Sequence, residues 1–363
     1  MPEIGRRALR ETPTARMPVG RKLDDPTRLA QVDAPAMVHS LSVLISTHDR
    51  ADLLERAIRH LNEAIRPGGW HVEVLVVANA CSDRTHAFLS DYVSGYSPST
   101  TTLRESRLGL KWVAEPAIGK SHAQNRAIPL LTSEWVAFVD DDHRVDPSYL
   151  VGVCSAVTSY PDADIFCGRI LPDWDGTEPA WVHDTGEYRI YPLPVPRYDL
   201  GDEPMPSPEE RGIPGGGNLV VRRALFERVG GFDTDFGPRG HNLEGGEDQE
   251  WVRRAIAAGA RIQYVPGIVQ HHYVDHERLK LSYLLRKAYE RSASVARMTS
   301  GPTMSGLVPR YLFSKAARHS LLAATALTAP RRRFHLVRAA ASLGEIKGHL
   351  QARADRAGRS KPR

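Results

Sequence analysis

Apolar and polar positions follow two alternating periods along the first half of the chain, which predicts a repeated strand–helix pattern. Continuous apolar runs such as LSVLIST (41–47) and VEVLVVA (72–78) are typical of strands buried on both faces. Between them, ADLLERAIRHLNEAI places its apolar residues on one helical stripe, and Pro67 with two glycines ends it. The expected strands are 41–47, 72–78, 110–116 and 134–140, and the expected helices are 51–65, 84–92 and 121–131.

Strand–helix units shorter than about 40 residues predict right-handed crossovers within one sheet. We therefore expect an α/β fold, in which a mixed, mostly parallel, Rossmann-like sheet is flanked by helices. In such sheets ligands bind beyond the carboxyl ends of the strands. The polar residues expected at that edge are His48, Asp49, Asn79, Asp83, Asp140, Asp141 and Asp142.

The pattern breaks after a helix near 147–159 and a strand at 164–170. Residues 172–212 carry many prolines and aromatic residues without periodicity, which is typical of a functional loop or lid. Strand and helix patterns then return, with a helix expected from Glu247 and a strand at 261–267. From about residue 276 the sequence has a helical pattern again.

The length of 363 residues exceeds one average domain. We expect an N-terminal extension at 1–38 that is poorly ordered, an α/β domain at 39–275 and a basic helical region at 276–363. The net charge is +5, and from Val308 onward thirteen basic residues face only two acidic ones. This excess predicts contact with an anionic surface, although a solvated tail is the alternative interpretation.

Three cysteines without CxxC spacing indicate reduced thiols and a cytoplasmic setting. The sequence contains neither a signal-peptide core nor an apolar run of about 18 residues. We expect a cytoplasmic protein that contacts the inner face of a membrane peripherally through its basic C-terminal helices. Nucleic acid is not expected as a partner.

Three adjacent carboxylates follow the predicted strand at 134–140. Asp140 and Asp142 point to the same side of an extended segment, so together they can hold a hard divalent cation. Asp141 points to the other side, and we include it among the residues expected to bind the ligand. A hydrated turn is the alternative interpretation, and the position at a strand end favours the ligand site.

Further candidate groups lie elsewhere in the chain. Asp248, beside Glu247 at a predicted helix start, is placed to act as a general base, although acidic residues there also stabilise a helix dipole. Imidazoles are common metal ligands. Lys120, at a predicted helix start, is suited to bind a phosphate. Gly216 and Gly217 allow a substrate to approach the backbone closely. The remaining candidates are His271, His272 and Trp181, whose aromatic ring suits stacking on a substrate.

Seven motifs occur in the order LSVLISTHDRADLLERAI, VEVLVVANACSDRT, GKSHAQNRAI, FVDDDHRVDP, GGGNLVVRR, GGFD and GEDQEW. Together they resemble the family 2 glycosyltransferases of GT-A fold, an inverting class that uses nucleotide-sugar donors. The resemblance covers about residues 40–275. It implies a GT-A domain, with the C-terminal helices as an extension.

The resemblance also implies roles for individual residues. Asp248 is the expected catalytic base, with Glu247 beside it, and Asp142 with one of His271 and His272 is expected on the metal. The residues expected to bind the nucleotide sugar are Ser46, Thr47, Asp49, Asn79, Asp83, Lys120, Asp140 and Asp141. Family members more often carry an acid where this chain has Ala78, and this departure bears on the choice of base.

The expected function is therefore transfer of a sugar from a nucleotide-diphosphate sugar, with UDP as the expected nucleotide, to an acceptor hydroxyl. The acceptor is a sugar, a lipid-linked molecule or a small molecule. A divalent cation, Mn²⁺ or Mg²⁺, neutralises the leaving diphosphate, and a single displacement inverts the anomeric centre. The alternatives are a nucleotidyl- or phosphoryl-transferase on a similar sheet and a non-catalytic basic binding protein. A dinucleotide-binding protein is disfavoured, because no GxGxxG follows an early strand.

Overall fold

The computed structural model describes residues 39–95, 107–235, 246–299 and 308–359. The predicted N-terminal extension at 1–38 lies outside these residues. The described residues all belong to one compact unit. The predicted division of this unit after residue 275 stays a prediction.

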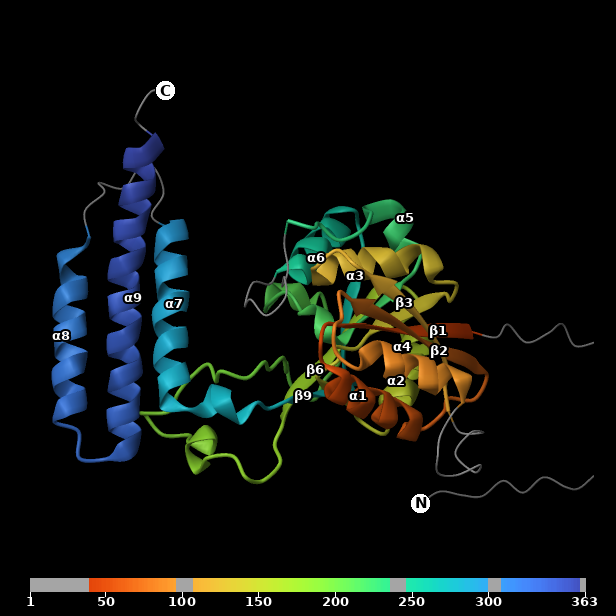
Figure 1. Ribbon diagram of the computed structural model, residues 1–363, viewed down its shortest axis with the longest axis horizontal. Coiled ribbons are helices and arrows are strands. Elements are labelled where there is room, and N and C mark those ends of the chain that lie inside the picture. The colour runs from red at the N-terminus through yellow and green to blue at the C-terminus, as the bar shows by residue number, and fades with distance from the viewer. Residues whose placement is uncertain (1–38, 96–106, 236–245, 300–307, 360–363) are drawn as a thin grey trace, which may run out of the picture. The chain divides into compact units, whose positions relative to one another are not determined.

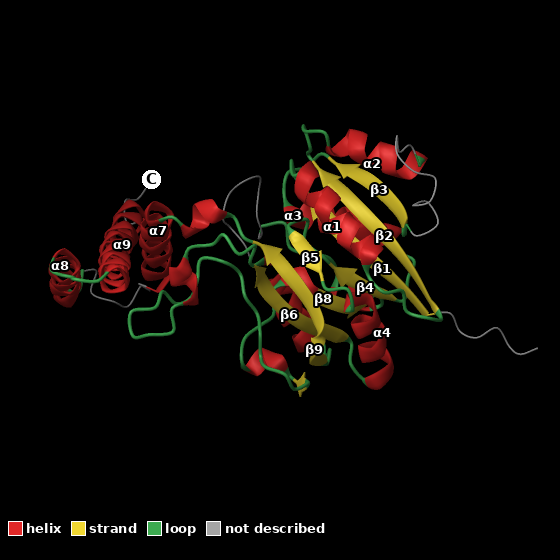
Figure 2. Ribbon diagram, turned by 90° about the horizontal axis from the view of Figure 1, so that it is seen from below, coloured by secondary structure: helices red, strands yellow, loops and turns green. Residues whose placement is uncertain are grey.

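The first half of the sheet is parallel, as the sequence predicts (Figures 1 and 2). Its strands are adjacent in the order β3-β2-β1-β4 and are joined by helices. Each strand lies within a few residues of its predicted bounds. The strands are β1 (His39–Thr47), β2 (Trp70–Asn79), β3 (Gly109–Glu115) and β4 (Trp135–Phe138).

The second half of the sheet is mixed and continues the order with β8-β6-β9-β5. β8 is antiparallel to both β4 and β6, whereas β6 and β9 are parallel to each other. The short strands β5 and β7 pair with β9 in antiparallel fashion. The predicted mixed, mostly parallel α/β sheet is thus confirmed. These strands are β5 (His143–Val145), β6 (Ile165–Asp173), β7 (Met205–Pro206), β8 (Leu219–Arg222) and β9 (Ile262–Tyr273).

Two features of this half were not expected from the sequence. β9 runs on to Tyr273, six residues beyond the predicted end, and β5 was not predicted at all. The residues that pair across these two strands are polar. His143 lies opposite His272, and Arg144 lies opposite His271. An apolar pattern cannot reveal a strand pair whose facing residues are histidine and arginine.

Helices cover both faces of the sheet, so two apolar layers form. The layer on one face packs α1 (Ala51–Glu63), α2 (Thr85–Ser94) and α4 (Tyr149–Ser159) against alternate residues of the strands. The opposite layer contains α3 (Lys120–Ala127), α5 (Leu225–Val229) and α6 (Glu247–Ala257). A strand buried on both sides explains the continuous apolar runs in the sequence.

The proline-rich segment contains little regular structure, as predicted. It holds the short 3₁₀ helices Ala180–His183 and Pro208–Glu210, and a third, Gly216–Asn218, precedes β8. Trp181 belongs to a small apolar cluster of its own and lies beneath the Arg333 guanidinium, 4.9 Å from its ring centre. One face of its ring therefore packs against Arg333, and the expected contact of Trp181 with a substrate stays a prediction.

The C-terminal region is helical, as predicted. After a short 3₁₀ helix, His276–Leu279, come α7 (Leu281–Thr299), α8 (Arg310–Ala324) and α9 (Ala329–Arg359), and α9 packs against both of the others (Figure 1). A Cβ on Gly344 or Gly348 would come within about 2.2 Å of a backbone oxygen of α7, so glycine permits this close packing. Within the described residues no helix is long and apolar enough to cross a membrane.

Candidate functional site

The acidic cluster lies at the carboxyl end of β4, in the turn that leads into β5. Asp141 points inward and is 5% exposed. It accepts hydrogen bonds from the Thr47 hydroxyl at 2.7 Å and from Arg50 at 3.1 Å. Burial, and after it the neighbouring Asp142, raises the pKa of the Asp141 carboxyl to about 6. The hydrogen bonds from Thr47 and Arg50 therefore hold Asp141, and with it the turn, in place.

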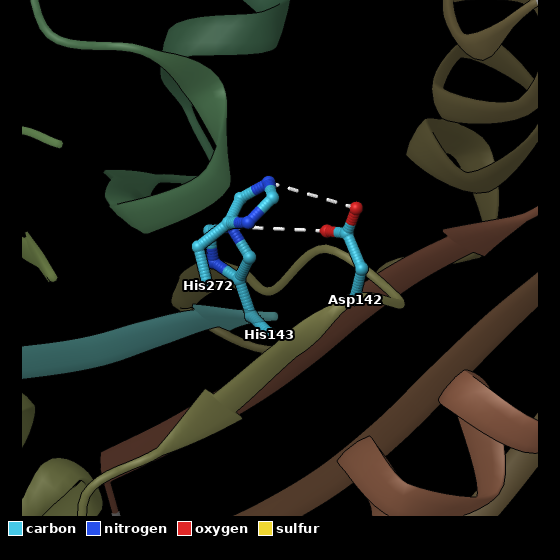
Figure 3. A group of neighbouring side chains, drawn as sticks. All are labelled: Asp142, His143 and His272. Atoms are coloured by element: carbon cyan, nitrogen blue, oxygen red, sulfur yellow. Dashed lines mark ion pairs between the residues drawn. The ribbon is translucent and has the colours of Figure 1, made fainter. Parts of the chain in front are cut away.

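Asp142 faces two histidines, His143 from β5 and His272 from β9 (Figure 3). The Asp142 carboxylate lies 3.9 Å from Nε2 of His143 and 3.6 Å from Nε2 of His272. One donor atom from each of the three residues lies within 4.8 Å of the others. Because β5 and β9 are paired, His143 stands directly opposite His272.

Hydrogen bonds determine which nitrogen of each imidazole carries the proton. In His272, Nδ1 lies 2.6 Å from the carbonyl oxygen of Tyr273, which only accepts, so Nδ1 is the donor. In His143, Nδ1 lies 2.7 Å from Oε1 of Gln270, which also accepts. In the neutral imidazoles both Nε2 atoms are then unprotonated, and both face the carboxylate.

The orientation of the Gln270 amide is itself fixed by its surroundings. Its nitrogen donates to the carbonyl of Phe138 and to Oδ1 of Asn218, each at 3.0 Å. Asn218 in turn donates to the carbonyls of Arg169 and Ile268. Gln270 and Asn218 are 0% and 1% exposed, so water does not compete for these bonds.

His271 lies outside this cluster. Successive side chains on a strand point to opposite faces, so His271 points away from Asp142 while His272 points toward it. Burial lowers the pKa of His271, and Arg144 lowers it further. Of the two histidines left open by the sequence, the structure brings only His272 to the acidic cluster.

Lys120 connects the acidic cluster with the start of α6. Its ammonium lies 2.7 Å from Asp140 and 3.7 Å from Glu247. Burial opposes the charge, but Asp140 and Glu247 outweigh it and raise the pKa of Lys120 above its ordinary value. Glu247 is 3% exposed, and its second oxygen has no hydrogen-bond partner among the described residues. Burial raises the pKa of this carboxyl.

Asp248 follows at the first turn of α6 and is half-buried. Its carboxylate accepts a hydrogen bond from the backbone N–H of Gly216. A Cβ on Gly216 would lie 2.7 Å from Cβ of Asp248, and one on Gly217 would lie 2.7 Å from an Asp140 oxygen. These glycines therefore make room for the acids of the site itself, and the predicted close approach of a substrate to them stays a prediction.

A second group of predicted residues lies at the ends of β1 and β2. The Asn79 amide donates hydrogen bonds to backbone carbonyls and accepts one from a backbone N–H within residues 115–119. This side chain therefore fixes the loop that leads into α3. Asp49 accepts from the backbone N–H groups of Ser82 and Asp83, and Asp83 accepts from Ala51 and Thr85. Ser46 is half-buried on β1.

Three residues of the site were missed by the sequence analysis. His143 and Arg50 lie inside quoted motifs, and the Arg50 guanidinium bridges Asp141 and Asp142 at 3.1 Å each. Asp141, His143 and Val145 are buried in alternation along the chain, but this alternation is visible only in the structure. Gln270 gave no signal in the sequence either, because its partners lie far away in the chain.

The sheet, with this edge of acids, histidines and lysine at its strand ends, has the GT-A fold. The model of the family "Glycosyl transferase family 2" matches residues 42–230, more than half of the chain, and the protein belongs to that family. The resemblance inferred from the motifs is thus confirmed.

Individual relatives are distant. The chain is 23% identical over 172 residues to a glucosyl-dolichyl phosphate glucuronosyltransferase of Haloferax volcanii, covering 47% of this chain and 53% of that protein. It thus spans about half of that relative's length. It is 24% identical to the succinoglycan biosynthesis protein ExoM of Rhizobium meliloti, covering 85% and 93%. A mannosyltransferase structure from Pyrobaculum calidifontis is similar in fold, with a TM-score of 0.50, 20% identity and coverage of 85% and 86%.

The raised pKa of Asp141 predicts a pH-dependent stability. An unfolded aspartate loses its proton near pH 3.8, whereas folded Asp141 keeps it until about pH 6. The folded state therefore binds more protons in this window, and this group lowers the free energy of unfolding as the pH rises through it. With a chelator present, urea denaturation of wild type and Asp141→Asn should diverge by about 1–3 kcal/mol between pH 4 and 7, in favour of the variant.

Asp162→Asn, at an 86% exposed side chain, serves as the control and should show no such divergence. Parallel pH profiles for wild type and Asp141→Asn would contradict the buried, desolvated placement of this carboxyl.

Proposed function

We propose that the protein transfers a sugar from a nucleoside diphosphate sugar to an acceptor hydroxyl, with a divalent cation bound at Asp142, His143 and His272. The observation that supports this proposal is the set of three acceptor groups that face one another. A carboxylate and two unprotonated imidazole nitrogens repel unless a cation lies among them. The remaining N–H of each histidine is bound to an oxygen, as is usual for metal-ligating histidines.

The cation would be Mn²⁺ or Mg²⁺, and we expect Mn²⁺ to bind more tightly. Mg²⁺ prefers oxygen ligands, whereas two of these three ligands are nitrogens. Bound there, the cation would neutralise charge on the leaving diphosphate. The Pyrobaculum mannosyltransferase structure contains GDP-Man and Mn²⁺, which agrees with this choice.

The donor would lie along the edge formed by the ends of β1, β2 and β4. In this proposal Ser46, Thr47, Asp49, Asn79 and Asp83 line the nucleotide. Their side chains act largely through the backbone loops that they hold in place. Lys120 would lie nearest to the diphosphate oxygens of the donor. Asp140 would lie nearest to the oxygens of its ribose. UDP is the first nucleotide to test, because the family resemblance favours it.

The acceptor hydroxyl would lose its proton to Asp248. The backbone N–H of Gly216 holds this carboxylate in a fixed direction at the start of α6. One base on the face opposite the leaving group is sufficient for a single displacement with inversion. Glu247 would act indirectly, through its contact with Lys120. The Haloferax relative is named for a lipid-linked acceptor, so a lipid-linked sugar is among the acceptors to test.

A thermal-shift panel of nucleotide sugars tests the donor and the metal together. With Mn²⁺ present, the matching donor at about 100 times its Kd should raise the melting temperature by several degrees. His272→Ala should lose this shift because it removes a ligand, whereas His271→Ala should keep it. If no nucleotide sugar raises the melting temperature, or if both variants lose the shift equally, the proposed site is wrong.

Asp248→Asn separates proton transfer from donor binding. It should lower the transfer rate by about 10²–10⁴-fold while leaving the donor Kd within about threefold of wild type. Single-turnover kinetics and calorimetric titration measure the two quantities. The anomeric configuration of the product, determined by NMR, checks inversion. A variant that retains its rate would exclude Asp248 as the base.

We further propose that the C-terminal helices contact an anionic membrane surface. The outer side of α8 exposes Tyr311, Phe313 and Leu321 by 64%, 54% and 65%, and α8 contains no acidic residue. This combination is typical of helices that lie in a membrane interface. Wild type should sediment with vesicles containing phosphatidylglycerol, and replacing the three residues by serine should abolish this. Equal sedimentation of the variant would contradict the contact.

A further inference from the structure

A cavity of about 220 Å³ lies between residues 189–194 and the helices α7 and α9. Leu284 and Phe334 contribute to an apolar part of its wall. Its charged lining consists of four cationic side chains, Arg189, Lys287, Arg291 and Arg338, and none of the lining residues is acidic. The cavity therefore combines an apolar wall with an excess of positive charge.

These four cations have no acidic partner within the part of the chain that the structure describes. Among the described residues none of them forms an ion pair, whereas Arg333 of the same helix, α9, pairs with Asp184 at 3.7 Å. Lys287 donates to the carbonyl oxygen of Pro194 at 3.2 Å, and Arg338 stacks on Phe334. Burial lowers the pKa of Lys287, and its cationic neighbours Arg278 and Arg291 lower it further. A cluster of unpaired cations stabilises a bound anion.

The apolar wall restricts the kind of anion. A free phosphate would satisfy the guanidinium and ammonium groups but leave the exposed ring of Tyr191 and the partly exposed ring of Phe334 in water. An amphiphile satisfies both parts of the cavity. The neighbouring surface points to a bilayer as its source, because Tyr191 at the cavity is 79% exposed and α9 also packs against α8 with its exposed aromatic residues.

We propose that this cavity holds the phosphate headgroup and the first acyl carbons of an anionic membrane phospholipid. In this proposal the lipid comes from a membrane, which rests on the membrane contact proposed above. It assigns that contact a specific binding site and involves none of the catalytic residues. A soluble, monomeric lipid can therefore test the cavity without a bilayer.

Isothermal titration calorimetry of the full chain with dioctanoyl phosphatidic acid, below its critical micelle concentration, measures this binding. We expect one saturable site per chain. Arg291→Ala/Arg338→Ala should weaken it about 25-fold, at about fivefold for each charge removed. Arg310→Ala/Arg332→Ala removes the same charge from exposed positions outside the cavity lining and should stay within twofold of wild type. Melting curves confirm that both variants are folded.

Several results would overturn the proposal. Equal losses in the two double variants would reduce the binding to general electrostatic attraction. Inorganic phosphate binding as tightly as the lipid would leave the apolar wall without a role. Farnesyl phosphate binding more than tenfold more tightly would assign the cavity to an isoprenyl phosphate. Absence of binding here, together with intact sedimentation on vesicles, would refute the cavity and leave the membrane contact standing.

Discussion

The hydrogen bonds of Gln270 are the interaction on which the candidate site depends. Two backbone carbonyls orient the Asn218 amide, and Asn218 together with the carbonyl of Phe138 orients Gln270. Gln270 then holds the proton of His143 on Nδ1 and directs Nε2 at the carboxylates. The side chains of Gln270, Asn218 and His143 are buried, where an unmade hydrogen bond costs about 1–3 kcal/mol, so the arrangement is strongly favoured over its alternatives.

The pairing of β5 with β9 also orients the residues of the site. It places His143 opposite His272 and carries the end of β9 to the acidic turn. Gly217 leaves the space that Asp140 and His143 occupy, and Gly216 leaves the space for Asp248. Lys120 then links the two groups of acids, because its ammonium lies between Asp140 and Glu247. The structure therefore concentrates negative charge and imidazole at one edge of the sheet.

The sequence predicted the parallel half of this sheet well, because strands buried on both faces leave continuous apolar runs. It also located the acidic turn, Lys120 and the start of α6, since each follows a predicted strand or begins a helix. It did not reveal β5 or the role of Gln270, because both depend on pairing between residues more than 100 positions apart. For the same reason the choice between His271 and His272 required the register of β9. Trp181 was expected at a substrate from its residue type alone, and its packing against Arg333 could not be predicted, because these residues also lie more than 100 positions apart.

The central claim is that two imidazole nitrogens and one carboxylate bind a single divalent cation. Pulsed electron paramagnetic resonance of bound Mn²⁺ in protein labelled with ¹⁵N-histidine tests it most directly. We expect couplings to two histidine nitrogens in the wild type, one in His143→Gln and two in the control His271→Gln. A spectrum without histidine couplings, or one unchanged in His143→Gln, would contradict it.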